Sequence, residues 1–198
     1  RIVERNQERI SHLVMDMLTF SKDRQPDLAP GQVNETIDEV VELVKGRAGE
    51  AGVELVWQPR TDLPLFSFDA DLLHRAILNV VGNAIDACEK RPGGRVDVAV
   101  EWSPGGLLLI IIIADNGEGI LEEDLKRIFS VFESRKGARG TGLGLPVSQK
   151  IMREHGGDIR VESKPGAGSR FYLELPANSS QLSRGTESFR LDTLRPDE

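Results

Sequence analysis

Two asparagines and an aspartate recur in the stretch "LNVVGNAIDA" at a spacing that a helix would bring onto one side. Asn79, Asn83 and Asp86 follow one another at intervals of four and three residues, so in a helix they form one polar stripe. Such a stripe is often only a solvated face. Asparagine is a mediocre helix former without a charge for solubility, however, so two of them one turn apart favour a ligand site. A neutral amide oxygen suits a magnesium ion that already carries phosphates.

A second group of candidate residues ends the aliphatic run in "LLLIIIIADNGEGI". Asp115 stands where a buried strand would stop, at the lip of an apolar pocket, and can accept a hydrogen bond from a ligand amine. Gly117 and Gly119 lack side chains, so a flat ring could approach the backbone closely. An ordinary turn would use the same residue types, because Asp-Asn-Gly is common turn chemistry. This motif is therefore weak on its own.

The stretch "RGTGLGLPVSQKI" is more specific. Gly140, Gly142 and Gly144 alternate just before a predicted helix with Pro146 in its first turn. Free backbone N–H groups at a helix N-terminus bind anions, whereas a flexible linker would not run into a helix start. No Gly-Lys-Ser/Thr follows, which excludes a Walker loop, and Leu145 occupies the third glycine position of the dinucleotide fingerprint. The stretch therefore predicts a phosphate site of another kind.

Between the two glycine-rich stretches lies "IFSVFESRKGARG". Phe129 and Phe132 could anchor a lid by their rings. Arg135, Lys136 and Arg139 would then supply positive charge near phosphates, with Lys136 or Arg139 the better candidate. The alternative is a basic surface loop without a ligand.

The elements that must position these residues mix helices with strands. Apolar residues at helical spacing and at alternate positions define them. Asp69 is a plausible N-cap for the helix that carries the asparagines, and Gly156 with Gly157 a plausible C-cap for the last helix. The pattern predicts a two-layer α/β sandwich, with one mixed sheet covered by helices on one face. The predicted helices span about 2–22, 34–49, 70–89 and 146–155, and the predicted strands lie near 53–57, 65–68, 96–102, 107–113, 159–161 and 171–175.

The core face of the helix over 70–89 is predicted beside its polar stripe. The strand over 107–113 is apolar on both sides and is expected to form a hairpin with the strand before it. The region over about 115–143 is expected to be loop-rich. The residues expected on the core face are Leu73, Ile77, Val80, Val81, Ala84 and Cys88.

Composition limits the possible functions. The formal net charge is −7 with acids and bases interleaved, which argues against nucleic-acid binding. One cysteine, Cys88, permits no intrachain disulfide and fits a reducing compartment. No apolar run approaches the ~20 residues that span a bilayer, so we expect a cytoplasmic fragment without membrane contact, from a parent protein that could be membrane-anchored. The chain starts at Arg1 and reads as part of something longer.

Taken in order, the motifs resemble a known family. "NVVGNAIDA", "DNGEGI", "FSVF" and "GTGLGL" resemble the N, G1, F and G2 boxes of sensor histidine kinases, in the GHKL ATPase superfamily with the Bergerat fold. The resemblance covers about residues 31–176, and "HGGDIRVESKPGAGSRFYLELP" is similar to the family's usual ending. It implies an ATP-binding catalytic domain with ATP and Mg²⁺ as cofactors.

The resemblance also implies a role for each box. Asn83 would bind the magnesium ion with Asn79 beside it, and Asp115 would receive the adenine amine. The segment between Phe132 and Gly140 would be a short ATP lid. Asn79 and Lys136 are the predicted catalytic residues. The predicted nucleotide-binding residues are Asn83, Asp86, Asp115, Gly117, Gly119, Ile120, Phe132, Arg139, Gly140, Thr141, Gly142, Leu143, Gly144 and Leu145.

The resemblance further implies partners and a domain order. Residues 1–24 resemble the second helix of a dimerisation hairpin, which would make the full-length protein a homodimer. Residues 25–177 would be the catalytic domain and 178–198 a disordered tail. The family's phosphoacceptor motif is absent, and we interpret His12, His74 and His155 as structural. The chain is therefore expected to pass the γ-phosphoryl group to a histidine outside it, and thence to an aspartate of a response-regulator receiver domain.

Two alternatives stay open. An ATP-hydrolysing clamp of the gyrase or mismatch-repair kind resembles this chain, but such hydrolases carry a glutamate where Asn79 stands. A non-catalytic nucleotide-binding pseudokinase is the other alternative, and the intact boxes weigh against it.

Overall fold

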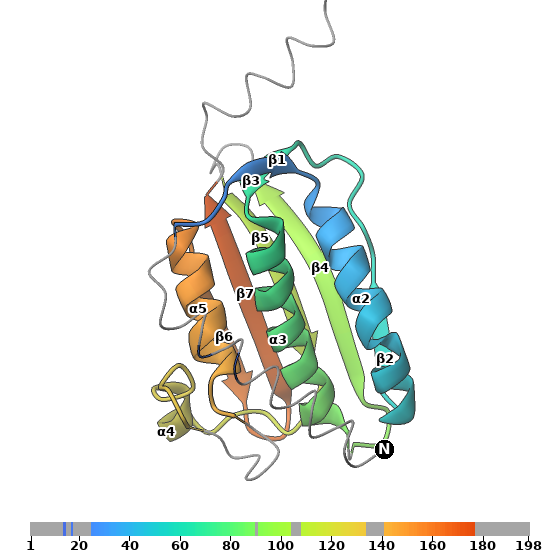
Figure 1. Ribbon diagram of the computed structural model, residues 1–198. Coiled ribbons are helices and arrows are strands. Elements are labelled where there is room, and N and C mark those ends of the chain that lie inside the picture. Colours follow the sequence, from blue (N-terminus) through green and yellow to red (C-terminus); the bar gives the residue numbers. More distant parts are fainter. Residues whose placement is uncertain are drawn as a thin grey trace, which may run out of the picture.

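The computed structural model describes residues 25–89, 91–103, 108–133 and 141–176, together with Val14 and Met17. Helices and strands are mixed along this part of the chain and form two layers (Figure 1). The elements are β1 (Ala29–Gly31), α2 (Val33–Glu50), β2 (Glu54–Trp57), β3 (Phe66–Phe68), α3 (Ala70–Cys88), β4 (Arg95–Ser103), β5 (Leu108–Asp115), α4 (Glu122–Leu125), α5 (Gly144–Glu154), β6 (Asp158–Lys164) and β7 (Gly168–Pro176).

The main sheet has five strands in the order β2-β4-β5-β7-β6. Strand β2 pairs with β4 in parallel, whereas every other pairing in this sheet is antiparallel. Helices α2, α3 and α5 lie side by side over one face of it (Figure 1). The predicted two-layer α/β sandwich with a mixed sheet is thus confirmed, and so is the hairpin of β4 and β5.

The core lies between this helical layer and the sheet. All six residues predicted for the core face of α3 are buried. Strand β5 alternates, since Leu109, Ile111 and Ile113 are buried whereas Ile110 and Ile112 are only partly so. The strand is apolar on both sides, as the sequence shows, but only one side is fully buried, because the described helices cover one face of the sheet only.

Three local features differ from the sequence prediction. Strands β1 and β3 form a separate two-stranded antiparallel sheet, with Ala29 opposite Phe68. The short helix α4 interrupts the region predicted as loop. Helix α5 begins at Gly144, two residues before the predicted start, so this glycine belongs to the helix rather than to the loop before it. Elements of three or four residues are too short to show a hydrophobic period.

The ends of α3 and α5 meet through Asp69 and His155. The Asp69 carboxylate accepts the Leu72 N–H at 3.1 Å, which confirms the predicted N-cap. The Asp69 N–H donates to His155 Nε2 at 3.0 Å, and His155 Nδ1 lies 2.8 Å from the Ile151 carbonyl oxygen. His155 therefore has the structural role that the sequence suggested, as the neutral tautomer with its proton on Nδ1.

Helix α5 ends as predicted. Gly156 adopts a φ of 79°, and its N–H donates to the Arg153 carbonyl at 2.9 Å. The Gly157 N–H donates to the Met152 carbonyl at 2.9 Å, which completes a Schellman motif.

The predicted N-terminal helix and C-terminal tail fall largely outside the described residues. Val14 and Met17 are helical and each is 48% exposed. Among the residues that the structure describes, no helix is both long enough and apolar enough to cross a membrane.

Candidate functional site

Asn79 joins the polar stripe of α3 to the beginning of α5. Its side-chain amide donates to the Gly144 carbonyl at 3.2 Å and to Ser148 Oγ at 3.3 Å. Two segments that the sequence singled out separately are therefore in direct contact. Asn83 is half-buried one turn further along α3, on the same side.

Ser148 completes this junction and was not predicted. Its hydroxyl is fully buried and lies 2.9 Å from the Gly144 carbonyl and 3.3 Å from the Ala76 carbonyl. A buried hydroxyl is stable only when it is hydrogen-bonded, so the pair of Asn79 and Ser148 fixes where α5 begins relative to α3. A serine on the buried side of α5, next to Val147, is the sequence signal that could have revealed it.

Asp86 forms an ion pair with Arg47 of α2. Gly82 lies beneath this contact, since a Cβ there would stand 3.3 Å from Arg47 Nη1. Arg47 was not among the candidates, because nothing in the sequence indicates that α2 reaches the polar stripe. In this structure the predicted nucleotide contact Asp86 is held by the protein itself.

Asp115 lies at the end of β5 on the buried face of the sheet. Its Oδ1 accepts the Gly117 N–H at 2.8 Å and the Ser169 N–H at 3.3 Å. Burial raises the pKa of the Asp115 carboxyl above its ordinary value, and the two N–H donors and the charge of Arg91 oppose the shift. A buried carboxylate with an oxygen left for a further donor suits a ligand amine.

Ser163 and Ser169 extend the position of Asp115 across three strands. Asp115 pairs with Ser169, and Ser169 pairs with Ser163. The two hydroxyl oxygens are 3.0 Å apart, and Ser163 Oγ accepts the Ile120 N–H at 2.8 Å. The predicted residue Ile120 is thus hydrogen-bonded to this row through its backbone. Neither serine was a candidate, because neighbours on adjacent strands can be identified only once the strand order is known.

The glycines of the loop after β5 are required by the protein's own backbone. A Cβ on Gly117 would stand 2.6 Å from the Ala87 carbonyl oxygen, and one on Gly119 would stand 2.2 Å from that of Lys164. Gly119 also has a φ of 71°. The loop therefore packs against α3 and the β6–β7 turn too tightly for side chains, a reason distinct from the predicted approach of a ring.

The segment before α5 is only partly described. Lys136, Arg139 and Gly140 lie outside the described residues. Gly142 has a φ of 67°, and a Cβ there would stand 2.6 Å from the Phe132 carbonyl carbon. Thr141 Oγ1 accepts the Leu143 N–H at 3.3 Å; Leu143 is buried and Leu145 half-buried.

Phe132 was predicted to anchor a lid, and residues 134–140, which would form that lid, lie outside the described residues. Phe132 is 68% exposed, its φ is 66°, and its N–H donates to the Gly142 carbonyl at 3.0 Å. Phe129 packs against the core instead. A non-glycine residue with left-handed backbone is strained, and such strain is concentrated at functional sites.

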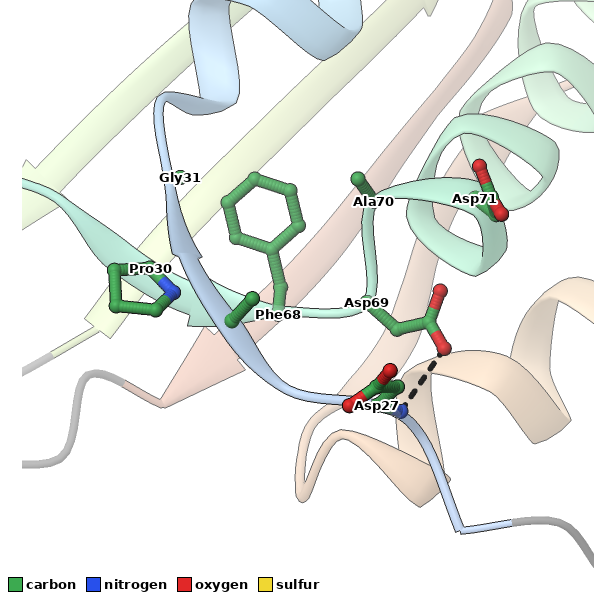
Figure 2. A pocket seen from close by; sticks show the side chains of 8 residues that line it. Asp27, Pro30, Gly31, Phe68, Asp69, Ala70 and Asp71 are labelled. Atoms are coloured by element: carbon green, nitrogen blue, oxygen red, sulfur yellow. Dashed lines mark hydrogen bonds between the residues drawn. The ribbon is translucent and has the colours of Figure 1, made fainter.

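The described residues line two separate hollows. The first, of about 340 Å³, is lined by Asp115, Ser163 and Ser169 together with their neighbours along the strands. It therefore lies across the end of β5, the end of β6 and the start of β7. The other, of about 280 Å³, lies between β1 and the start of α3, where the Asp69 carboxylate accepts the Asp27 N–H (Figure 2). None of the predicted site residues lines the second hollow.

Comparison with known proteins identifies what this arrangement is similar to. The family model described as "Histidine kinase-, DNA gyrase B-, and HSP90-like ATPase" matches residues 68–179, more than half of the chain. The chain is 34% identical over 177 residues to the signal transduction histidine-protein kinase AtoS of Escherichia coli K12, which covers 89% of this chain and 28% of AtoS. The chain thus spans well under half the length of this curated relative.

Solved structures of similar fold include histidine kinases. Full-length ShkA in complex with AMPPNP matches 87% of this chain and 37% of its own, with a TM-score of 0.76 and 29% identity. ThkA in complex with the response regulator protein TrrA matches 91% of this chain and 51% of its own, with a TM-score of 0.72 and 25% identity.

Proposed function

Because this chain belongs to the histidine kinase-, DNA gyrase B- and HSP90-like ATPase family, we propose that it supplies the ATP-dependent kinase step of a two-component sensor histidine kinase. In the whole protein it transfers the γ-phosphoryl group of ATP to a histidine outside residues 1–198. The observation that carries the proposal is the contact of Asn79 with Gly144 and Ser148. This contact joins the asparagine helix to the glycine segment, as one site for a triphosphate and its metal requires.

Within this proposal each described residue has a defined part. Asp115 accepts the adenine amine, and the N–H groups at the start of α5 face the phosphates. Asn83 holds Mg²⁺, which neutralises phosphate charge. No group of three or more His, Cys, Asp or Glu side chains among the described residues could hold a metal ion by itself. A magnesium ion bound by one amide oxygen and shared with the phosphates fits that donor set.

The hydrolase alternative is disfavoured by the chemistry of position 79. An amide cannot accept a proton from water as a glutamate does, and the Asn79 amide is already engaged with the start of α5. Fast, steady phosphate release from the purified chain would overturn this choice. Slow or absent release together with tight nucleotide binding is the expected result.

The proposed function is tested by supplying the missing acceptor in trans. The chain is mixed with labelled ATP, Mg²⁺ and a hairpin that carries the acceptor histidine, and acid-labile phosphohistidine is measured. Phosphohistidine should form with the wild type and fall sharply with Asn83→Ala, whose folding is checked by thermal unfolding. ATP binding without any transfer would instead support the pseudokinase alternative.

The partners follow from the same proposal. A response-regulator receiver domain takes the phosphoryl group from the histidine, as the pairing of the related ThkA with TrrA suggests. We assign residues 1–24 to a dimerisation hairpin, 25–177 to the catalytic domain and 178–198 to a tail. The exposed apolar side chains of Val14 and Met17 support an interface there. Sedimentation of the full-length protein should give a dimer, and a monomer at micromolar concentration would contradict this assignment.

A further inference from the structure

Arg91 links three segments at the Asp115 end of the sheet. It is the third residue after the end of α3, and its backbone N–H donates to the Cys88 carbonyl at 2.9 Å. Its guanidinium Nη1 donates to the Gly117 carbonyl at 2.8 Å and to the Gly166 carbonyl at 2.9 Å. One side chain thus connects the end of α3, the loop after β5 and the β6–β7 turn.

Backbone hydrogen bonds complete a closed set of contacts around the loop after β5. The Glu118 N–H donates to the Ala87 carbonyl at 3.2 Å, and the Gly166 N–H donates to the Glu118 carbonyl at 2.7 Å. The loop is therefore attached to α3 and to the turn by its backbone, and Arg91 adds the bonds to Gly117 and Gly166 that close the set.

The other side of the same loop is held by Asn116. Its amide nitrogen donates to the Gly93 carbonyl at 2.9 Å, and its oxygen accepts the Arg95 N–H at 2.8 Å. The connection from α3 to β4 therefore holds the loop through the side chain of Asn116 as well as through that of Arg91.

The position of this loop sets the position of the Asp115 carboxylate. The Gly117 N–H donates to Asp115 Oδ1 at 2.8 Å, while the Gly117 carbonyl is the group that Arg91 holds. Both groups belong to the same residue, on either side of its Cα, so a shift of Gly117 would move the carboxylate with it. The positive charge of Arg91 also opposes the rise in the pKa of Asp115 that burial causes, and so favours its ionised form.

We propose that Arg91 is a positioning residue for the purine end of the nucleotide site. It holds Gly117 so that Asp115 is oriented for the exocyclic amine of adenine before the nucleotide binds. The inference rests on the proposed function, because it assumes that Asp115 receives adenine. Because Arg91 donates to the Gly117 and Gly166 carbonyls, the proposed effect belongs to base recognition and not to the metal or the transferred group.

The test compares Arg91→Met, Arg91→Lys and Arg60→Met. Methionine keeps the apolar stem and removes both hydrogen bonds, lysine keeps a charged donor, and Arg60 is an exposed arginine paired with Asp62 beyond the far end of β2. Titration calorimetry measures the Kd of Mg-ATP, Mg-ADP and Mg-GTP, and thermal unfolding is followed in parallel.

Arg91→Met should raise the Kd of ATP and of ADP by the same factor, roughly three- to tenfold, because two partly exposed hydrogen bonds are lost. The preference for ATP over GTP should fall. Arg91→Lys should recover part of both losses, and Arg60→Met should change neither. The melting temperature without nucleotide should stay close to that of the wild type, because the lost contacts lie at the surface.

Three results would overturn the inference. One is that Arg91→Met keeps the wild-type Kd of Mg-ATP and the wild-type preference for ATP over GTP, while Asp115→Asn loses both. Another is a loss of affinity that affects ATP but not ADP, which would place Arg91 at the γ-phosphate. The last is a wild-type protein that binds no adenine nucleotide, or that binds it with the same Kd as the Asp115→Asn variant. This result would refute the proposed function and this inference with it.

Discussion

Gly142 and Gly144 stand two residues apart in the same glycine-rich segment, yet the structure predicts opposite consequences for an alanine at each. Gly142 has a φ of 67°, and an added Cβ would stand 2.6 Å from the Phe132 carbonyl carbon. Gly144 has an ordinary helical backbone, and an added Cβ would stand 3.6 Å from Asn79 Cγ, a normal packing distance.

The expected magnitudes follow from these geometries. A left-handed backbone costs an alanine about 1–2 kcal/mol, and relief of the contact with Phe132 adds to that cost. For a domain of this size, each kcal/mol lowers the melting temperature by about 2–4 °C. If the segment rearranges locally instead, the same energy appears as a roughly 5–30-fold weaker nucleotide affinity. Gly144→Ala gains helix propensity of up to about 1 kcal/mol, and its Cβ faces α3.

Differential scanning fluorimetry with and without Mg-ATP, followed by calorimetry, measures both quantities for the two variants. Gly142→Ala should lose stability or affinity by these amounts. Gly144→Ala should match or exceed the wild-type melting temperature and bind within about threefold of the wild type, a difference under about 1 kcal/mol. Equal effects of the two substitutions would refute the steric reasoning.

Two further predictions concern buried polar groups. Asp115→Asn keeps an oxygen for the Gly117 N–H but removes a buried charge; because burial raises the carboxyl pKa, the Asp115 contribution to stability is present at low pH and is lost as the pH rises through that pKa. The melting temperature of the variant should therefore equal or exceed that of the wild type at neutral pH, and the difference should vanish in acid. A lower melting temperature at neutral pH would contradict the burial argument. Asp97→Asn, which changes an exposed surface ion pair, is the control. Asn79→Ala and Ser148→Ala should each cost about 1–3 kcal/mol in urea unfolding, and the double variant less than the sum, because the two side chains share the Gly144 carbonyl. Strict additivity would show that they act separately.

The sequence was most informative where one chemical pattern repeats along an element. The core face of α3, the Asp69 cap and the glycine stop after α5 were all predictable, because each depends on neighbours within one or two turns. The contact between the asparagine stripe and the glycine segment was implied only by the family resemblance, since 65 residues separate Asn79 from Gly144.

Residues that act across the fold were missed for a different reason. Ser163, Arg47 and Arg91 are of ordinary type at ordinary spacing, and only the strand order and the packing of α2 and the α3–β4 connection bring them to the site. Gly117 and Gly119 were singled out for the approach of a ring, which stays a prediction, and the structure adds a packing reason that the sequence did not reveal. Their need for glycine comes from Ala87 and Lys164, which lie far from them in sequence.

Helices α3 and α5 run antiparallel and are fastened to each other at two separate places, by Asn79 near the start of α5 and by His155 at its end (Figure 1). Because the two helices are hydrogen-bonded at both places, neither a shift of α5 along α3 nor a rotation about its own axis can occur without breaking one of these contacts. The separation between the Asn83 turn and the first turn of α5 is therefore fixed when the chain folds. A nucleotide that binds both helices meets a gap of preset width, and the entropy needed to order that gap is lost during folding rather than during association.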